Sequence, residues 1–158
     1  MSINSRFRTS EDREINGIVL EYTNEAGEVL AWFKCARPGG RNIEFQKSMS
    51  KRMLEFKGQL QDGNQSLYNK ILAQVFYDAV ILEWGGDIEG KDGENPAELT
   101  EENVVWLFTK DCPDLFEDLQ SRLEVRKQWQ DEAVESAAKN SKTASATNSS
   151  GGSKKKAS

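Results

Sequence analysis

Histidine is absent from this 158-residue sequence, and cysteine occurs only twice. Because histidine is the most frequent general base and metal ligand in proteins, its absence removes the commonest route to acid–base catalysis or a metal centre. Cys35 and Cys112 have no base nearby in the sequence that would activate a thiolate, so we interpret both as structural free thiols. We therefore expect no catalytic residue, no cofactor and no metal site, and we predict that the protein is not an enzyme.

Long hydrophobic runs are also missing. No apolar stretch approaches the roughly 20 residues that a membrane-spanning helix needs. The first residues carry the basic Arg6 without the hydrophobic segment that follows such residues in a secretory signal. Two free thiols suit a reducing compartment. We expect a cytoplasmic protein that does not bind membranes.

Large apolar side chains are scarce at the end of the chain. From residue 137 onward the sequence consists of alanine, serine, threonine, asparagine, glycine and lysine. Such a segment buries too little apolar surface to offset the entropy of ordering it. We predict a disordered tail at 137–158, a flexible polar arm at 1–13 and a single folded domain at 14–136.

The net charge of −5 is unevenly distributed along the chain. Residues 1–57 carry +2, residues 58–135 carry −12 and residues 136–158 carry +5. The acidic middle would repel phosphate backbones, so nucleic acid is a poor candidate partner. The three lysines at 154–156 lack aromatic neighbours and add little specificity for nucleic acid. Two interpretations of the acidic surface stay open, solubility alone or the meeting of a basic partner.

The N-terminal half predicts a β-hairpin covered by a helix. Ile15–Tyr22 and Val29–Cys35 are rich in β-branched and aromatic residues, and residues 24–27 between them supply a turn. Apolar residues then recur at helical spacing at Phe45, Met49, Met53 and Phe56. Because a lone hairpin is marginally stable, we expect this helix to lie on it. Lys47 and Lys51 fall on another face of the same helix.

The second half predicts further helices. The strongest apolar stripe contains Tyr68, Leu72, Val75, Ala79 and Leu82, and Gly85-Gly86 ends that helix. Thr100 is placed as the N-cap of a short helix over Val104–Phe108. Pro113 is suited to the first position of a last helix that runs to about Glu135. The predicted fold class is α+β, with an N-terminal β-hairpin packed on a mainly α-helical bundle and a disordered C-terminal tail.

The last predicted helix carries two apolar residues outside its core row. Val125 and Trp129 lie roughly 80–120° away from Leu119 on a continuous helix. Either the helix bends so that Trp129 folds back on a neighbour, or Val125 and Trp129 form an exposed strip for a helical partner. We take these two residues as candidate partner-binding residues, with the basic face at Lys47 and Lys51 as the next candidate.

Three segments together resemble one known family. Tyr77–Trp84 reads YDAVILEW, Leu99–Phe108 reads LTEENVVWLF, and Pro113–Leu119 reads PDLFEDL. This succession of helix starts and core positions, within residues 68–125, is similar to the tail assembly chaperones of long-tailed, siphovirus-like bacteriophages. The residues at 87–98 and the N-terminal hairpin match that family more loosely.

The resemblance implies a function and a set of partners. Such chaperones bind the tape measure protein, keep it soluble, help to recruit tail tube protein, and are absent from the mature virion. It also implies a longer form made by a programmed frameshift, whose extension contacts the tube protein. The lysines at 154–156 fit a slippery site, and a solubility tail would look the same. The implied location is the host cytoplasm, and self-association stays open.

The alternative interpretation is a structural virion protein, such as a tail completion or connector component. That class would also lack catalytic residues and would also bind other proteins. The two interpretations differ in whether the chain is present in mature particles.

Overall fold

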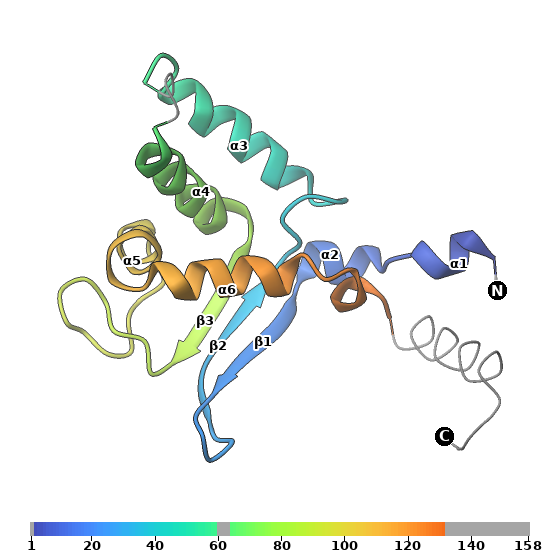
Figure 1. Cartoon of the computed structure of the whole chain (residues 1–158), viewed down its shortest axis with the longest axis horizontal. Coiled ribbons are helices and arrows are strands. Elements are labelled where there is room, and N and C mark those ends of the chain that lie inside the picture. Colours follow the sequence, from blue (N-terminus) through green and yellow to red (C-terminus); the bar gives the residue numbers. More distant parts are fainter. Residues whose placement is uncertain (1, 60–63, 132–158) are drawn as a thin grey trace.

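The computed structural model describes residues 2–59 and 64–131, and its elements are drawn in Figure 1. The predicted tail at 137–158 lies outside the described residues. Within the predicted N-terminal arm the chain forms α1 (Ile3–Phe7), and α2 (Glu11–Asn16) follows. The side chain of Ser10 caps α2 by accepting a hydrogen bond from the backbone N–H of Arg13. The domain boundaries at 14–136 stay a prediction.

The predicted hairpin is present, and a third strand extends it. β1 (Ile18–Thr23) pairs antiparallel with β2 (Val29–Cys35), which pairs antiparallel with β3 (Ile81–Gly86). The first strand begins later than the sequence predicts, because Ile15 lies in α2. In the turn, the Asn24 carboxamide oxygen accepts hydrogen bonds from the backbone N–H groups of Ala26 and Glu28.

The prediction that Leu82 belongs to a helix is wrong, because the chain turns from helix to strand at Val80. The helix ends at Ala79 and β3 begins at Ile81. Gly86 is not the end of a helix but part of the strand, with φ of +95°. A side chain at Gly86 would overlap the backbone oxygen of Leu30 on the neighbouring strand. Glycine therefore allows β3 to approach β2 closely.

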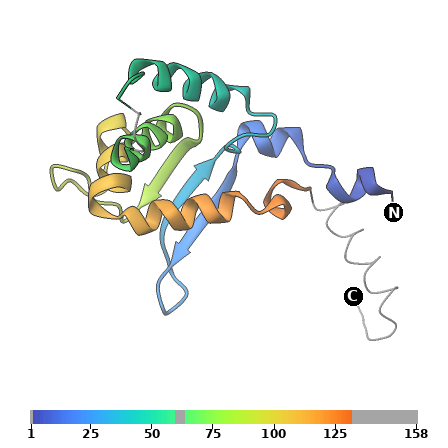
Figure 2. The same cartoon turned by 45° about the horizontal axis from the view of Figure 1, so that its top comes forward.

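The helices α3 (Ile43–Glu55) and α4 (Gln65–Ala79) form a pair. The expectation that the first of them lies on the hairpin is wrong, because α3 packs on α4 (Figure 2). The ring of Phe45 meets the ring of Phe76 edge-on, with 6.5 Å between centroids. The predicted central role of the second helix agrees with its buried residues, which include Ile71, Val75 and Phe76.

The short helices follow the local signals in the sequence. The Thr100 hydroxyl accepts a hydrogen bond from the backbone N–H of Asn103 and so caps α5 (Glu101–Trp106). The chain then widens into a π-helical turn, η1 (Leu107–Asp111), and Pro113 is the first residue of α6 (Pro113–Leu123).

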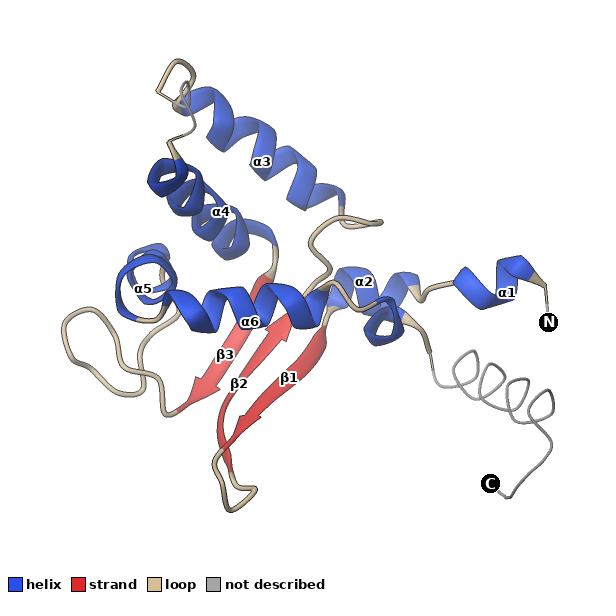
Figure 3. Ribbon diagram, viewed as in Figure 1, coloured by secondary structure: helices blue, strands red, loops and turns tan. Residues whose placement is uncertain are grey.

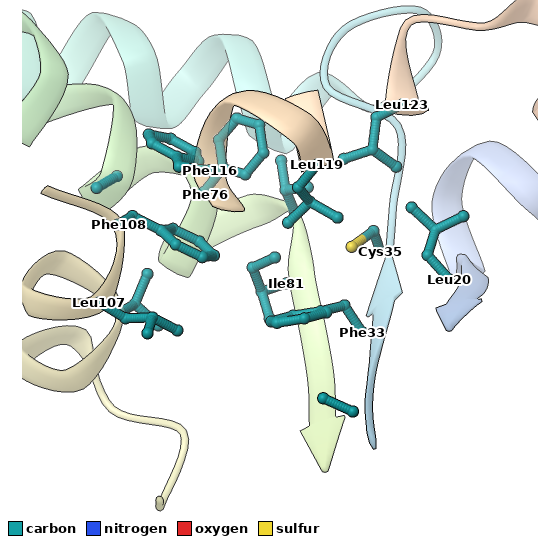
Figure 4. Close-up of a cluster of buried hydrophobic side chains, with 14 of the residues drawn as sticks. Leu20, Phe33, Cys35, Phe76, Ile81, Leu107, Phe108, Phe116, Leu119 and Leu123 are labelled. Atoms are coloured by element: carbon teal, nitrogen blue, oxygen red, sulfur yellow. The ribbon is translucent and has the colours of Figure 1, made fainter. Parts of the chain in front are cut away.

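One face of the sheet carries the hydrophobic core. The helix α6 crosses the three strands (Figure 3) and is tied to β1 by a 2.7 Å hydrogen bond from the Tyr22 hydroxyl to Asp118. Figure 4 shows the side chains that meet there, among them Phe33 from the sheet and Leu119 from α6. The stacked rings of Phe108 and Phe116 lie 4.5 Å apart and close one end of this core. The predicted α+β fold class is confirmed.

The last helix is shorter than predicted. It ends at Leu123 rather than near Glu135, and a 3-10 turn, η2 (Arg126–Trp129), follows. Trp129 is 0% exposed, and its indole N–H donates a 2.8 Å hydrogen bond to the backbone oxygen of Leu123. The interpretation in which Trp129 folds back on a neighbour is therefore correct, and the continuous apolar strip with Val125 does not form.

A buried carboxylate joins the N-terminal helix to the loop before α3. Glu14 is 1% exposed and accepts hydrogen bonds from the Thr9 hydroxyl at 2.5 Å, the Arg37 guanidinium at 3.0 Å and the Arg41 backbone N–H at 2.9 Å. A side chain at Gly40 would overlap this carboxylate, and the backbone there has φ of +55°, so both the space and the conformation favour glycine. These contacts satisfy the buried charge from three sides.

Candidate partner-binding cleft

The structure places the four sequence-predicted site residues on separate elements. Val125 is 49% exposed in the short link between α6 and η2, whereas Trp129 is buried. Lys47 and Lys51 are exposed on α3, where Lys47 forms an ion pair with Glu44 at 3.5 Å. The structure therefore does not bring these residues into one site, and their role in partner binding stays a prediction.

A larger candidate site lies where α4 packs against α5 and η1. It is a cleft of about 740 Å³ that contains both apolar and polar side chains. The residues that matter most for its chemistry are Leu67, Lys70, Gln74, Val105, Trp106 and Lys110. Its volume is within the range in which proteins bind ligands or anchoring side chains.

Local sequence chemistry fixes the two walls of the cleft. On one side, the Asn64 side chain accepts a hydrogen bond from the backbone N–H of Leu67 and starts α4. On the other side, the π-helical turn η1 closes with a hydrogen bond from the backbone N–H of Cys112 to the Leu107 oxygen. The Thr109 hydroxyl donates to the Val105 oxygen at 2.6 Å in the same turn. Single π-helical turns are frequent at functional sites.

The acidic residues at and beside the cleft are already paired. Arg52 on α3 donates to Asp78 and to Glu101, with nitrogen–oxygen distances of 2.8 Å in both ion pairs. Burial alone would raise the pKa of Asp78, but the hydrogen bonds and charge of Arg52 hold that pKa below its usual value. Lys91 forms an ion pair with Glu102 at 3.2 Å. The Lys91–Glu102 pair is balanced in charge, whereas Arg52 is shared among Glu55, Asp78 and Glu101, so that cluster stays net negative beside the cleft.

Within the described residues, two lysines that line the cleft lack an ion-pair partner, and one buried amide lacks a hydrogen-bond partner for its oxygen. Lys70 on α4 and Lys110 on η1 are exposed, and neither forms an ion pair with any carboxylate in residues 2–59 or 64–131. Gln74 is 7% exposed, and its Nε2 donates a 3.4 Å hydrogen bond to Glu101. The Gln74 Oε1 atom is buried and has no hydrogen-bond partner within the described part of the chain. Such a buried acceptor is costly to leave unpaired.

The cysteine thiols are poorly suited to act as nucleophiles. Burial raises the pKa of Cys35 to about 12, and burial together with a hydrogen bond to Asp111 raises the pKa of Cys112. Both thiols are therefore protonated near neutral pH. Across the described residues, His, Cys, Asp and Glu side chains form no group of three or more that could hold a metal ion. In the same residues no helix has the length and hydrophobicity needed to span a bilayer.

Comparison with known proteins places this small α+β protein among phage-derived proteins. A family model described as YdaY prophage protein matches residues 40–140, which is more than half of the chain. The chain belongs to this family. The matched region contains both walls of the cleft. Neither the curated proteins nor the solved structures include a match to the chain.

Sequence reasoning missed the residues of the cleft. Lys70 and Lys110 are far apart in the sequence, and only the packing of α4 against η1 brings their elements together. One signal was available, because Gln74 interrupts an apolar run from Ile71 to Phe76. A polar residue inside such a stripe indicates a buried hydrogen bond or a ligand contact.

Proposed function

We propose that this chain is a phage tail assembly chaperone, a non-enzymatic protein that binds the tape measure protein in the host cytoplasm and keeps it soluble during tail assembly. The observation that carries the proposal is the cleft between α4 and α5–η1, which is lined by partly exposed apolar side chains and by a buried hydrogen-bond acceptor that has no partner among the described residues. This combination suits an anchoring segment of another protein, which supplies both apolar surface and hydrogen-bond donors.

The apolar part of the cleft gives a reason for affinity. Leu67, Val105 and Trp106 line the cleft and are each partly exposed. Removing such surface from water contributes about 25 cal/mol per Å². An apolar side chain from a partner helix, seated against Trp106, would supply this contribution, as in other helix-in-groove complexes.

One of the three segments that resemble tail assembly chaperones contributes residues to the cleft. The segment Leu99–Phe108 forms α5 and contributes Glu101, Val105 and Trp106 to the cleft. The segment Tyr77–Trp84 spans the end of α4 and most of β3, and Pro113–Leu119 begins α6. Two of the three segments therefore build the core, and the middle one also supplies cleft residues. The phage origin of the family agrees with this role.

Recruitment of tail tube protein belongs to the same proposal. As the resemblance implies, that contact is made mainly by a longer, frameshifted form that carries a C-terminal extension. The lysine codons at 154–156 are the candidate slippery site, and they lie outside the described residues. The cleft would then serve the tape measure protein in both forms.

A single charged substitution at the cleft tests the proposal. Leu67→Glu places a carboxylate against the apolar surface, while the first turn of α4 accepts a negative charge because of the helix dipole. We expect affinity for the tape measure protein of the same phage genome to fall by about tenfold or more, with an unchanged melting temperature. Co-expression with the chain first identifies a soluble segment of the tape measure protein. Affinity is then measured by titrating the purified chain against that segment.

Two comparison variants make the result specific. Val19→Glu introduces the same charge at a 55% exposed position on β1 and should leave affinity unchanged. Val125→Glu tests the position predicted from sequence. Loss of binding with Val125→Glu, and wild-type binding with Leu67→Glu, would move the interface to the end of α6.

A further inference from the structure

We infer that the cleft between α4 and η1 recognises an acidic amphipathic segment, with a carboxylate for Lys70 and Lys110, an apolar anchor for Trp106 and a hydrogen-bond donor for Gln74. This inference rests on the proposed function and specifies the chemistry of the partner at the same site. It commits the cleft to one kind of occupant, a protein segment with negative charge.

The charge of the cleft favours an anion. The lining carries three lysines, Lys70, Lys91 and Lys110, against two glutamates, Glu101 and Glu102. Within the described residues Lys70 and Lys110 have no carboxylate partner, whereas Glu101 and Glu102 form ion pairs with Arg52 and Lys91. Two lysines on opposite walls, each without a carboxylate partner in residues 2–59 and 64–131, attract a carboxylate placed between them.

The start of α4 adds to this preference. Asn64, Ser66 and Leu67 bring the N-terminus of this 15-residue helix to the cleft, and its first turn contains no acidic residue. A helix N-terminus carries partial positive charge, which acidic side chains of the chain itself commonly complement. The Asn64 side chain caps one N–H group of this turn, and the partial positive charge of the turn favours an acidic group of the partner nearby.

The buried amide of Gln74 adds a requirement that charge alone does not. Its Oε1 accepts no hydrogen bond from the described residues, while its Nε2 is held by Glu101. Since Oε1 can only accept, an occupant that supplies an N–H or O–H group satisfies it. A protein segment carries acidic side chains, hydrogen-bond donors and an apolar anchor together, whereas inorganic phosphate, which keeps an O–H donor near neutral pH, lacks the apolar anchor.

The acidic surface around Lys70 and Lys110 restricts where an acidic partner can bind. Residues 58–135, which contain nearly all of the cleft, carry −12 in total, so most of the surface of this half of the chain repels acidic segments. A partner must therefore place its negative charge at the cleft and not elsewhere. This arrangement favours specificity over non-specific attraction.

The test uses overlapping peptides that cover the tape measure protein of the same phage genome, titrated against the full chain. We expect the binding peptides to be acidic, with apolar residues at i, i+3 and i+4 spacing. The double variant Lys70→Glu with Lys110→Glu should weaken the best peptide by about tenfold or more, and a peptide with its acidic residues changed to lysine should bind this variant better than it binds the wild type. Binding should also weaken as salt is raised.

Matched variants separate the cleft from total charge. Arg6→Glu with Arg8→Glu makes the same change in net charge at the N-terminal end of the chain and should leave peptide affinity within twofold of the wild type. Lys47→Glu with Lys51→Glu tests the basic face of α3 in the same way. A loss confined to the Lys47 and Lys51 variant would overturn the inference.

The remaining outcomes distinguish this inference from the proposed function. If the tape measure protein binds, but neither Lys70 nor Lys110 matters and the bound peptides are neutral or basic, the inference fails and the proposed function stands. If acidic peptides of other proteins bind through Lys70 and Lys110 and no tape measure peptide does, the proposed function fails and the inference stands. Equal binding of inorganic phosphate, competing with the peptide at millimolar concentration, would show a simple anion site and overturn the inference.

Discussion

Trp129→Ala should destabilise the protein by about 3–5 kcal/mol, because the indole is fully buried and alanine would leave a large cavity. The substitution also removes the hydrogen bond from the indole N–H to the Leu123 oxygen. For a domain of this size the expected fall in melting temperature is on the order of 10 °C. Chemical denaturation and a thermal scan of the full chain measure both quantities.

Hydrogen bonds between α2 and η2 explain why the destabilisation by Trp129→Ala should extend beyond η2. The backbone N–H of Ser10 donates to the Trp129 oxygen at 2.7 Å, and the Arg13 guanidinium donates to the Gln128 oxygen at 3.0 Å. Loss of the indole should therefore loosen α2 as well as η2. Trp32→Ala, at a half-buried position on β2, is the comparison and should have a smaller effect. A stable Trp129→Ala variant that fails to bind the tape measure protein would restore the interface interpretation of Trp129.

Glu14→Gln should destabilise the protein by roughly 2–4 kcal/mol near neutral pH, because it removes the charge that pairs with Arg37 inside the fold. The amide also cannot accept every hydrogen bond that the carboxylate accepts from Thr9, Arg37 and Arg41. Glu11→Gln, at an exposed position of the same helix, should change stability by less than about 0.5 kcal/mol. Equal effects of the two substitutions would show that Glu14 contributes no more than a surface charge.

The same residue sets a pH dependence. Burial alone would raise the pKa of Glu14, but hydrogen bonds from Thr9, Arg41 and Arg37 together hold that pKa below its usual value of 4.5. A lowered pKa in the folded state stabilises the protein above the unfolded value, and this contribution is lost as pH falls below about 4.5. The difference in unfolding free energy between wild type and Glu14→Gln should therefore be largest near pH 7 and shrink towards pH 3.

Local chemistry explains which elements could be predicted from the sequence. Thr100 marks a helix start because its hydroxyl accepts a hydrogen bond from a backbone N–H of the first turn. Pro113 marks another because it lacks the N–H that would be unpaired at that position. Both signals act within one helical turn. The turn at Asn24 is encoded in the same local way. These features do not depend on distant residues, so the sequence pattern is sufficient to locate them.

The misplaced elements depend on tertiary contacts. Leu82 continues the spacing of the α4 stripe, and only pairing with β2 turns that segment into a strand. The turn after Leu123 is set by the burial of Trp129 against the body of the protein, which helical periodicity does not encode. The candidate cleft was missed for the same reason, because only the packing of α4 against η1 brings Lys70 and Lys110 to the same cleft.

A protein census of purified phage particles tests the chaperone proposal most directly. We predict that the chain co-sediments with the tape measure protein in lysates taken during assembly, and that quantitative mass spectrometry of finished virions finds tape measure and tail tube proteins without this chain. Tail tube protein serves as the positive control for particle recovery. A constant, stoichiometric amount of the chain in purified virions would contradict the proposal and identify a structural virion protein.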